Sequence, residues 1–136
     1  MKVLALDLGD QWTGSALSDG LKMFARPYKT VKTKELNSFL IDLFKIEKIS
    51  IVVVGYPQTL KGTESQQTKT IIAMKEELEK DFSEKTWAFW DERNTSKQAK
   101  NMGSSKKDKH HIHSVAAALI LEGYLLHLHI KSQLET

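Results

Sequence analysis

The sequence has 136 residues, enough for one core of ordinary size, and we expect residues 1–136 to form a single domain. It contains no cysteine, which excludes a disulfide framework, thiolate catalysis and a cysteine-bound zinc site. The longest apolar run, Val115 to Leu121, is too short to span a bilayer, and the first 20 residues do not resemble a signal peptide. We therefore expect a cytoplasmic protein without a membrane partner.

The formal net charge of +3 is unevenly distributed along the chain. Between Arg93 and His113 the sequence contains six Lys or Arg residues and a single acid, Asp108, so this segment carries a formal charge of +5. A local basic segment favours an anionic partner, with nucleic acid as the first candidate. From charge alone, a solvated lysine-rich loop is an equally good interpretation.

Three strand patterns come first in the chain. Lys2 to Leu8 is short and largely apolar, as is typical of a strand covered on both faces. Trp12 to Asp19 and Lys22 to Val31 follow, separated by Asp19-Gly20, a common hairpin turn. Three consecutive strands with short turns predict an antiparallel meander.

Helix and strand patterns then alternate. Apolar residues recur at helical spacing from Leu36 to Phe44, and Thr33 is the candidate N-cap of this helix. The segment Ile49 to Gly55 is apolar and rich in β-branched residues. This composition predicts a central strand of the sheet.

A capping box at Thr63 to Gln66 predicts a second helix, whose apolar face continues to Phe82. Lys85 to Trp90 is the predicted fifth strand. We expect a short polar helix from Thr95 to about Met102 and a last helix from about Ile112 to Lys131. The order βββ-α-β-α-β-α-α predicts an α/β domain with a mixed sheet.

Acidic residues at the strand ends are the best candidates for chemistry. Asp7 shares a strand face with Val3 and Ala5, and Asp91 and Glu92 follow the fifth strand. Ligand sites in open α/β sheets cluster at the carboxyl ends of strands. Carboxylates gathered there repel each other unless a cation neutralises them, and Mg²⁺ or Mn²⁺ suits oxygen ligands and phosphate chemistry.

A purely structural interpretation of these acids stays open. Asp7 could accept hydrogen bonds from the turn between Gly9 and Gly14. Either Asp91 or Glu92 could pair with Arg93. Spacing alone does not choose between these pairings and a metal site.

The order of Asp7, "VVGYPQTLKGTES", "WDERNTS" and "IHSVAAALILEGYL" resembles the YqgF family. Members of this family are bacterial proteins similar to Holliday-junction resolvases and are regarded as nucleases that process the 5′ end of pre-16S rRNA. The match runs from Leu4 to Leu125. It implies an RNase H-like α/β fold with a mixed five-stranded sheet, in which three antiparallel strands precede two parallel ones and helices cover both faces.

The resemblance also implies a metal-dependent nuclease that acts in ribosome biogenesis. Asp7, Asp91 and Glu92 match the family's acids and would be catalytic, with Asp7 and Glu92 binding Mg²⁺ or Mn²⁺. His113 stands where such proteins carry an aspartate before the last helix. A neutral imidazole can bind a transition metal, and it suits Mn²⁺ better than Mg²⁺. We therefore expect His113 to be a catalytic residue and a metal ligand.

Candidate nucleic-acid contacts surround these residues in the sequence. Trp12, in a turn beside the proposed site, is the candidate for stacking on a base. Arg93 is expected to touch the substrate, and Lys106, Lys107 and Lys109 to bind phosphates. The expected partner is structured RNA or, alternatively, branched DNA, and the expected state is a monomer or weak homodimer.

Three other functions remain open at this point. His113 adds no negative charge, so a catalytically weakened, RNA-binding ribosome-assembly factor is one alternative. A Holliday-junction-type DNA resolvase is the second. The stretch "DLGDQWTG" also resembles the first phosphate loop of actin-like ATPases, but a single domain cannot build their two-domain cleft.

Overall fold

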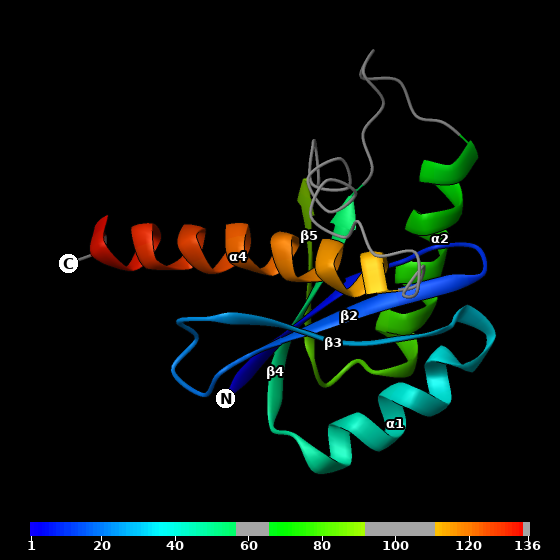
Figure 1. Cartoon of the computed structure of the whole chain (residues 1–136), viewed down its shortest axis with the longest axis horizontal. Coiled ribbons are helices and arrows are strands. Elements are labelled where there is room, and N and C mark those ends of the chain that lie inside the picture. Colours follow the sequence, from blue (N-terminus) through cyan, green and yellow to red (C-terminus); the bar gives the residue numbers. More distant parts are fainter. Residues whose placement is uncertain (57–65, 92–110, 135–136) are drawn as a thin grey trace.

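The structure is a computed structural model that describes residues 1–56, 66–91 and 111–134. Within these ranges the chain forms one sheet in the order β3-β2-β1-β4-β5, with helices on both faces (Figure 1). The elements are β1 (Lys2–Asp7), β2 (Trp12–Ser18), β3 (Ala25–Lys32), the 3₁₀ helix η1 (Thr33–Glu35), α1 (Leu36–Ile46), β4 (Ile49–Tyr56), α2 (Gln66–Asp81), β5 (Thr86–Asp91) and α4 (His111–Leu134). The helix expected over 95–102 and most of the expected capping box lie outside the described residues.

The sheet is mixed, as predicted. β1 pairs antiparallel with β2 and parallel with β4, while β2–β3 is antiparallel and β4–β5 is parallel. β1 and β4 lie in the middle because strands covered on both faces need apolar side chains on both. The carboxyl ends of β1, β4 and β5 meet at one edge of the sheet, here called the carboxyl edge.

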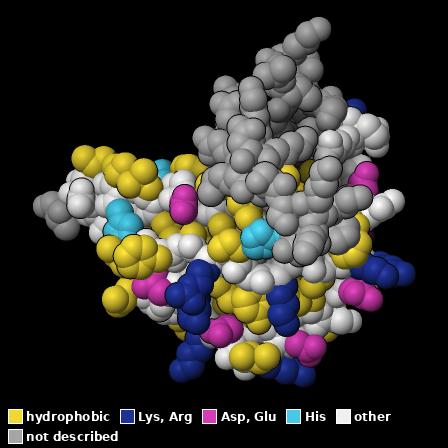
Figure 2. All heavy atoms as spheres, in the orientation of Figure 1, with side chains coloured by type: hydrophobic (Ala, Val, Ile, Leu, Met, Phe, Trp, Pro, Cys, Tyr) yellow, Lys and Arg dark blue, Asp and Glu magenta, His cyan; other side chains and the backbone are white. Residues whose placement is uncertain are grey.

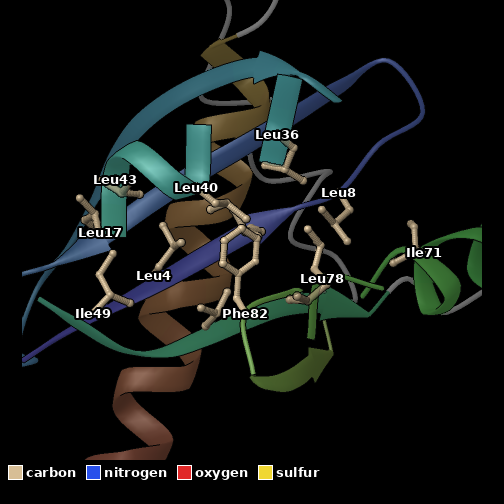
Figure 3. Packing of buried hydrophobic residues seen from close by; sticks show 13 residues of the cluster. Leu4, Leu8, Leu17, Leu36, Leu40, Leu43, Ile49, Ile71, Leu78 and Phe82 are labelled. Carbon is tan, nitrogen blue, oxygen red and sulfur yellow. The ribbon is translucent and has the colours of Figure 1, made fainter. Parts of the chain in front are cut away.

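One face of the sheet packs against α1 and α2. Leu4 of β1 and Val54 of β4 are fully buried there. Helical spacing directs side chains of α1, α2 and the residue after α2 onto the same cluster, as Figure 3 shows for Leu36, Leu40, Leu43, Ile71, Leu78 and Phe82. Full burial of such a side chain stabilises a fold by about 1.5–3 kcal/mol.

The other face of the sheet packs against α4. Val3, Ala5 and Val53 lie under Ile120 and Leu121 of this helix, and all five are fully buried. By length and composition alone α4 could cross a membrane. Its contacts with β1, β2 and β3 instead make it the core helix of this face.

The connection between β2 and β3 is longer than predicted. Because β3 begins at Ala25, the two-residue turn predicted at Asp19-Gly20 is wrong. The Asp19 carboxylate accepts hydrogen bonds from the backbone N–H groups of Met23 and Phe24, at 2.7 and 2.9 Å. These bonds, that of Phe24 above all, lower the pKa of Asp19. Lys22, with a φ of 58°, makes the left-handed turn that a longer loop requires.

Thr33 does not cap α1, so the predicted capping role is wrong. It begins η1, and neither η1 nor α1 has a side-chain cap. The Thr33 hydroxyl donates a hydrogen bond to the Gly9 carbonyl at 2.7 Å, and its backbone N–H donates to the Gln11 carbonyl at 2.9 Å. Thr33 therefore ties the end of β3 to the turn between β1 and β2, which fixes this turn at the carboxyl edge.

Candidate functional site

Asp7 is the last residue of β1 and lies at the carboxyl edge. Side chains alternate along a strand, so Asp7 points to the same face as Val3 and Ala5, toward α4. Its side chain is only 15 % exposed. Within the described residues, no hydrogen bond joins its carboxylate to the turn that follows β1. A carboxylate this buried needs a partner, and α4 supplies the candidate.

His113 lies in the first turn of α4, above the end of β1. Its Nδ1 atom is 3.7 Å from the Oδ2 atom of Asp7, and its side chain is 34 % exposed. Ser114, the next residue, is buried and its hydroxyl donates to the carbonyl of His111 at 2.9 Å, which closes this first turn. The N-terminus of a helix favours a nearby negative charge, and here Asp7 provides that charge. The structure thus brings together two predicted site residues more than 100 positions apart.

Gly14 allows α4 to come this close to the sheet. Gly14 of β2 is the cross-strand partner of Asp7, and a Cβ atom at this position would overlap the backbone of His113 and Ser114. The first turn of α4 occupies the space that the missing side chain of Gly14 leaves open.

Replacing Gly14 with alanine should therefore damage both the fold and the site. The added methyl group meets backbone rather than a flexible side chain, so α4 must move away from β2. Overpacking of this kind costs about 1–3 kcal/mol, and we expect Gly14→Ala to lower the free energy of unfolding by about 3 kcal/mol. Urea-induced unfolding followed by circular dichroism measures this loss.

Gly20→Ala is the matched control for this prediction. A Cβ atom at Gly20 would have no heavy atom within 4 Å, and the residue is exposed. Its substitution should change stability by less than about 0.5 kcal/mol. Equal destabilisation by the two variants would mean that helix packing against Gly14 is not the cause.

Asp91 reaches the carboxyl edge but not the face of Asp7. Along β5, Trp87 and Phe89 pack in the cluster under α1 and α2, and Trp90 packs in the cluster under α4. The alternation of the strand places Asp91 with Trp87 and Phe89, on the opposite face from Asp7. The side-chain pattern of β5 therefore separates the two predicted acids by the thickness of the sheet.

The other predicted site residues fall into two groups. Trp12 begins β2, and strand alternation puts it on the α4 face with Gly14 and Ala16, diagonally beside Asp7. The remaining predicted residues lie outside the described ranges: Glu92, Arg93, Lys106, Lys107 and Lys109. Asp7, His113 and Trp12 are thus the predicted site residues that the described structure brings to one place.

The Asp7–His113 pair supplies two side chains suited to a divalent cation. A carboxylate oxygen and an imidazole nitrogen are both ligands of first-row metals. Two ligands with bonds of about 2.1 Å to one ion lie at most about 4.2 Å apart, so the observed 3.7 Å is compatible with a shared ion. Within residues 1–56, 66–91 and 111–134, no group of three or more metal-ligating side chains occurs. A third ligand would have to come from elsewhere in the chain.

Two basic residues lie beside Trp12 that the sequence did not indicate as site residues. A cavity of about 300 Å³ at the carboxyl edge is lined by Asp10, Gln11, Trp12, Lys32 and Lys34. In the sequence the two lysines follow a predicted strand, in a short basic stretch from Lys29 to Lys34 that carries no motif. Only strand pairing, which sets Lys32 opposite Trp12, brings them to the site.

A known protein family matches almost the whole chain. A family model described as "RuvX: Holliday junction resolvase" matches residues 1–127. A relative from Christiangramia forsetii is 40 % identical over 131 residues, covering 91 % of this chain and 97 % of its own. Another from Rubrobacter xylanophilus is 36 % identical over 127 residues and 91 % of each chain. Both relatives carry the name "Putative pre-16S rRNA nuclease".

Two solved structures share the fold. The T. thermophilus RuvC protein in complex with a Holliday junction substrate has a TM-score of 0.56 and 16 % identity, over 88 % of this chain and 91 % of that one. The fowlpox virus resolvase in complex with Holliday junction DNA has a TM-score of 0.54 and 17 % identity, over 94 % and 99 %. At these identities the similarity concerns the fold alone, and it confirms the predicted RNase H-like architecture.

Proposed function

The chain belongs to the RuvX family of Holliday junction resolvases, and we propose that it is a metal-dependent nuclease of structured nucleic acid. The names of its relatives agree with the resemblance to the YqgF family that the sequence shows. The observation that carries the proposal is the pairing of Asp7 with His113, 3.7 Å apart at the carboxyl edge. The nuclease names of relatives 36–40 % identical to the chain support the same class of enzyme. The reaction is the hydrolysis of a phosphodiester bond in the cytoplasm.

Asp7 and His113 would hold one side of a Mg²⁺ or Mn²⁺ ion. Such an ion supplies Lewis acidity to the scissile phosphate and a water whose pKa is lowered. The N-terminus of α4 lies beside both residues, and its backbone N–H groups would favour a phosphate there. Asp7 provides the negative charge of the pair, so its loss should affect the cation most.

Glu92 is the better candidate than Asp91 for the second acid. Both were predicted to be catalytic, but the pattern of β5 directs Asp91 away from the face of Asp7. Glu92 is the other acid that the family resemblance indicates, and it lies outside the described residues. We assign Glu92 to the cation and leave Asp91 outside the reaction.

The proposed substrate is the precursor of 16S rRNA, cleaved at its 5′ end. The names of the relatives support RNA, whereas the name of the family supports branched DNA as the second candidate. Cleavage of a 5′-extended 16S leader RNA and of a four-way DNA junction should be compared at equal concentrations with Mg²⁺ or Mn²⁺. Faster cleavage of the RNA is expected. Cleavage of the junction alone would establish the second candidate, and cleavage of neither would favour an RNA-binding assembly factor.

The lysines at positions 106, 107 and 109 should contribute affinity without sequence preference. The triple variant Lys106→Ala, Lys107→Ala and Lys109→Ala should weaken binding of all RNA sequences alike. Each lost phosphate contact should also reduce the slope of log affinity against log salt by about 0.7–0.9. Fluorescence anisotropy across a salt series measures both effects.

A matched control removes three exposed lysines far from the carboxyl edge. Lys45 lies in the last turn of α1, Lys48 directly precedes β4, and Lys80 lies in the last turn of α2. Their replacement by alanine changes the net charge equally and should leave the salt slope unchanged. A slope that falls equally in both triple variants would attribute the effect to net charge and not to the 106–109 segment.

A further inference from the structure

The cavity around Trp12 combines an aromatic ring with two cations at the carboxyl edge. It has a volume of about 300 Å³, within the range of small-ligand sites, and is lined by Asp10, Gln11, Trp12, Lys32 and Lys34. Trp12 is half-buried, while both lysines are exposed. Among the described residues neither lysine forms an ion pair. Two lysines against the one carboxylate of Asp10 leave the cavity with a net positive charge, which favours an anionic ligand.

Strand pairing fixes how these groups face one another. Trp12 and Lys32 are directly opposite across β2 and β3, so both side chains stand on the α4 face, with Cβ atoms about 4.5–5.5 Å apart. Trp12 is also two residues before Gly14, the cross-strand partner of Asp7. The cavity and the Asp7–His113 pair consequently share one face of the sheet as diagonal neighbours.

The walls of the cavity are held in place before any ligand binds. The Thr33 hydroxyl and backbone N–H bind the carbonyls of Gly9 and Gln11, which anchors η1 and its Lys34 to the turn that carries Trp12. Gly9 lies so close to Trp12 that a Cβ atom there would overlap the Trp12 carbonyl. A preformed site loses less freedom on binding, which favours affinity.

We propose that this cavity is a substrate subsite, in which a nucleotide next to the scissile phosphate stacks its base on Trp12 and places its phosphate between Lys32 and Lys34. The assignment rests on the proposed function for the position of the scissile phosphate, beside Asp7. Stacking on a tryptophan tolerates every base, so the subsite holds the strand without reading its sequence. Acidic and basic side chains are interspersed over the face of the molecule in Figure 2. On such a surface, a local pair of lysines can hold the nucleic-acid strand at one position, whereas a uniformly basic surface would hold it at many.

Binding without cleavage tests the subsite directly. A fluorescein-labelled hexamer of single-stranded oligoadenylate is titrated with the wild-type protein in EDTA and followed by anisotropy. Trp12→Leu should weaken binding about 5- to 100-fold because the stacking surface is lost, whereas Trp12→Phe should stay within about threefold. Lys32→Ala with Lys34→Ala should reduce the salt slope by about 0.7, the value for one neutralised phosphate on a single strand, and the distant pair Lys45→Ala with Lys48→Ala should leave it unchanged.

Each remaining outcome decides the proposal. Unchanged affinity of Trp12→Leu, or an unchanged slope of the lysine pair, would overturn it; so would equal loss in the distant control. Displacement of the hexamer by AMP as effectively as by unlabelled hexamer would make the cavity a free-nucleotide site and would also overturn it. Cleavage of RNA with Mn²⁺ is measured in parallel: binding that follows these expectations without any cleavage would reject the nuclease proposal but not the subsite.

Discussion

Asp7→Asn should abolish cleavage while the protein remains folded. The substitution keeps the size of the side chain but removes the negative charge that pairs with a cation beside His113. The variant should lose several kcal/mol of transition-state stabilisation. At about 1.4 kcal/mol per factor of ten, its cleavage rate should fall by a factor of at least about 10³. Single-turnover cleavage of a structured RNA with Mn²⁺ measures the effect.

The stability of the same variant separates a functional from a structural role. A carboxylate that is only 15 % exposed and lacks a cation destabilises the fold, so its neutral amide should leave the unfolding temperature unchanged or raise it. Addition of Mn²⁺ should raise the unfolding temperature of the wild type but not that of Asp7→Asn, because a bound ligand stabilises only the state that binds it. This second measurement does not depend on catalysis.

Asp42→Asn is the matched control. It makes the same change of charge at an exposed position of α1, on the opposite side of the sheet. Its cleavage rate and its response to Mn²⁺ should equal those of the wild type. If Asp7→Asn cleaves RNA normally, Asp7 has no part in the reaction. If it fails to fold and the wild type shows no metal response, the role of Asp7 is structural, through its contact with His113.

The fold could be predicted because its strongest patterns are local. The segment "ISIVVVG" is apolar at every position except one, which only a strand covered on both faces requires, and β4 is such a strand. The loop between β2 and β3 could not be predicted in the same way. There Asp19 binds two backbone N–H groups and Lys22 takes a left-handed conformation, and neither choice is visible in a turn motif that Asp19-Gly20 satisfies equally well.

The sequence indicated two residues that the structure brings together, but it did not indicate the orientation of a third. The order of motifs indicated Asp7 and His113, and the structure sets them side by side. The face of Asp91 was hidden because the neighbouring positions Trp87, Phe89 and Trp90 are all aromatic, so hydrophobicity does not show which of them lie under α4. Lys32 and Lys34 were hidden because the pairing of β2 with β3 joins Lys32 to Trp12, and η1 then brings Lys34 to the same cavity.

His113→Asp should raise Mg²⁺-dependent cleavage. An aspartate oxygen and the Nδ1 atom of histidine are each three bonds from Cα, so the new oxygen can occupy the position now 3.7 Å from the Asp7 carboxylate. The substitution adds one negative charge and exchanges a nitrogen ligand for the oxygen that Mg²⁺ prefers. Position 113 is in the first turn of α4, where a carboxylate is favoured by about 0.3–1 kcal/mol, and this offsets part of the repulsion from Asp7.

We expect the Mg²⁺-dependent rate of this variant to rise about tenfold or more. In the wild type the rate with Mn²⁺ should exceed that with Mg²⁺, because an imidazole favours the transition metal. His113→Ala should lower the Mn²⁺ rate about 10- to 100-fold or more, because loss of a group that only orients a metal ligand already costs this much. Calorimetric titration with each ion should follow the same order, so the prediction has a readout other than activity.

His113→Asn separates charge from geometry in this experiment. Its amide oxygen can stand where Nδ1 stands, but it adds no charge, so a rise in Mg²⁺ activity with His113→Asp and not with His113→Asn attributes the gain to the third carboxylate. If both His113→Asp and the wild type cleave, with opposite metal preferences, the protein is a nuclease whose imidazole replaces an acid. If only His113→Asp cleaves, the natural protein binds RNA on a nuclease fold, and the imidazole is the reason that it does not cut. If the wild type cleaves and no substitution at His113 changes its rate or metal preference, the contact with Asp7 is structural and the cation must take its other ligands from residues outside α4.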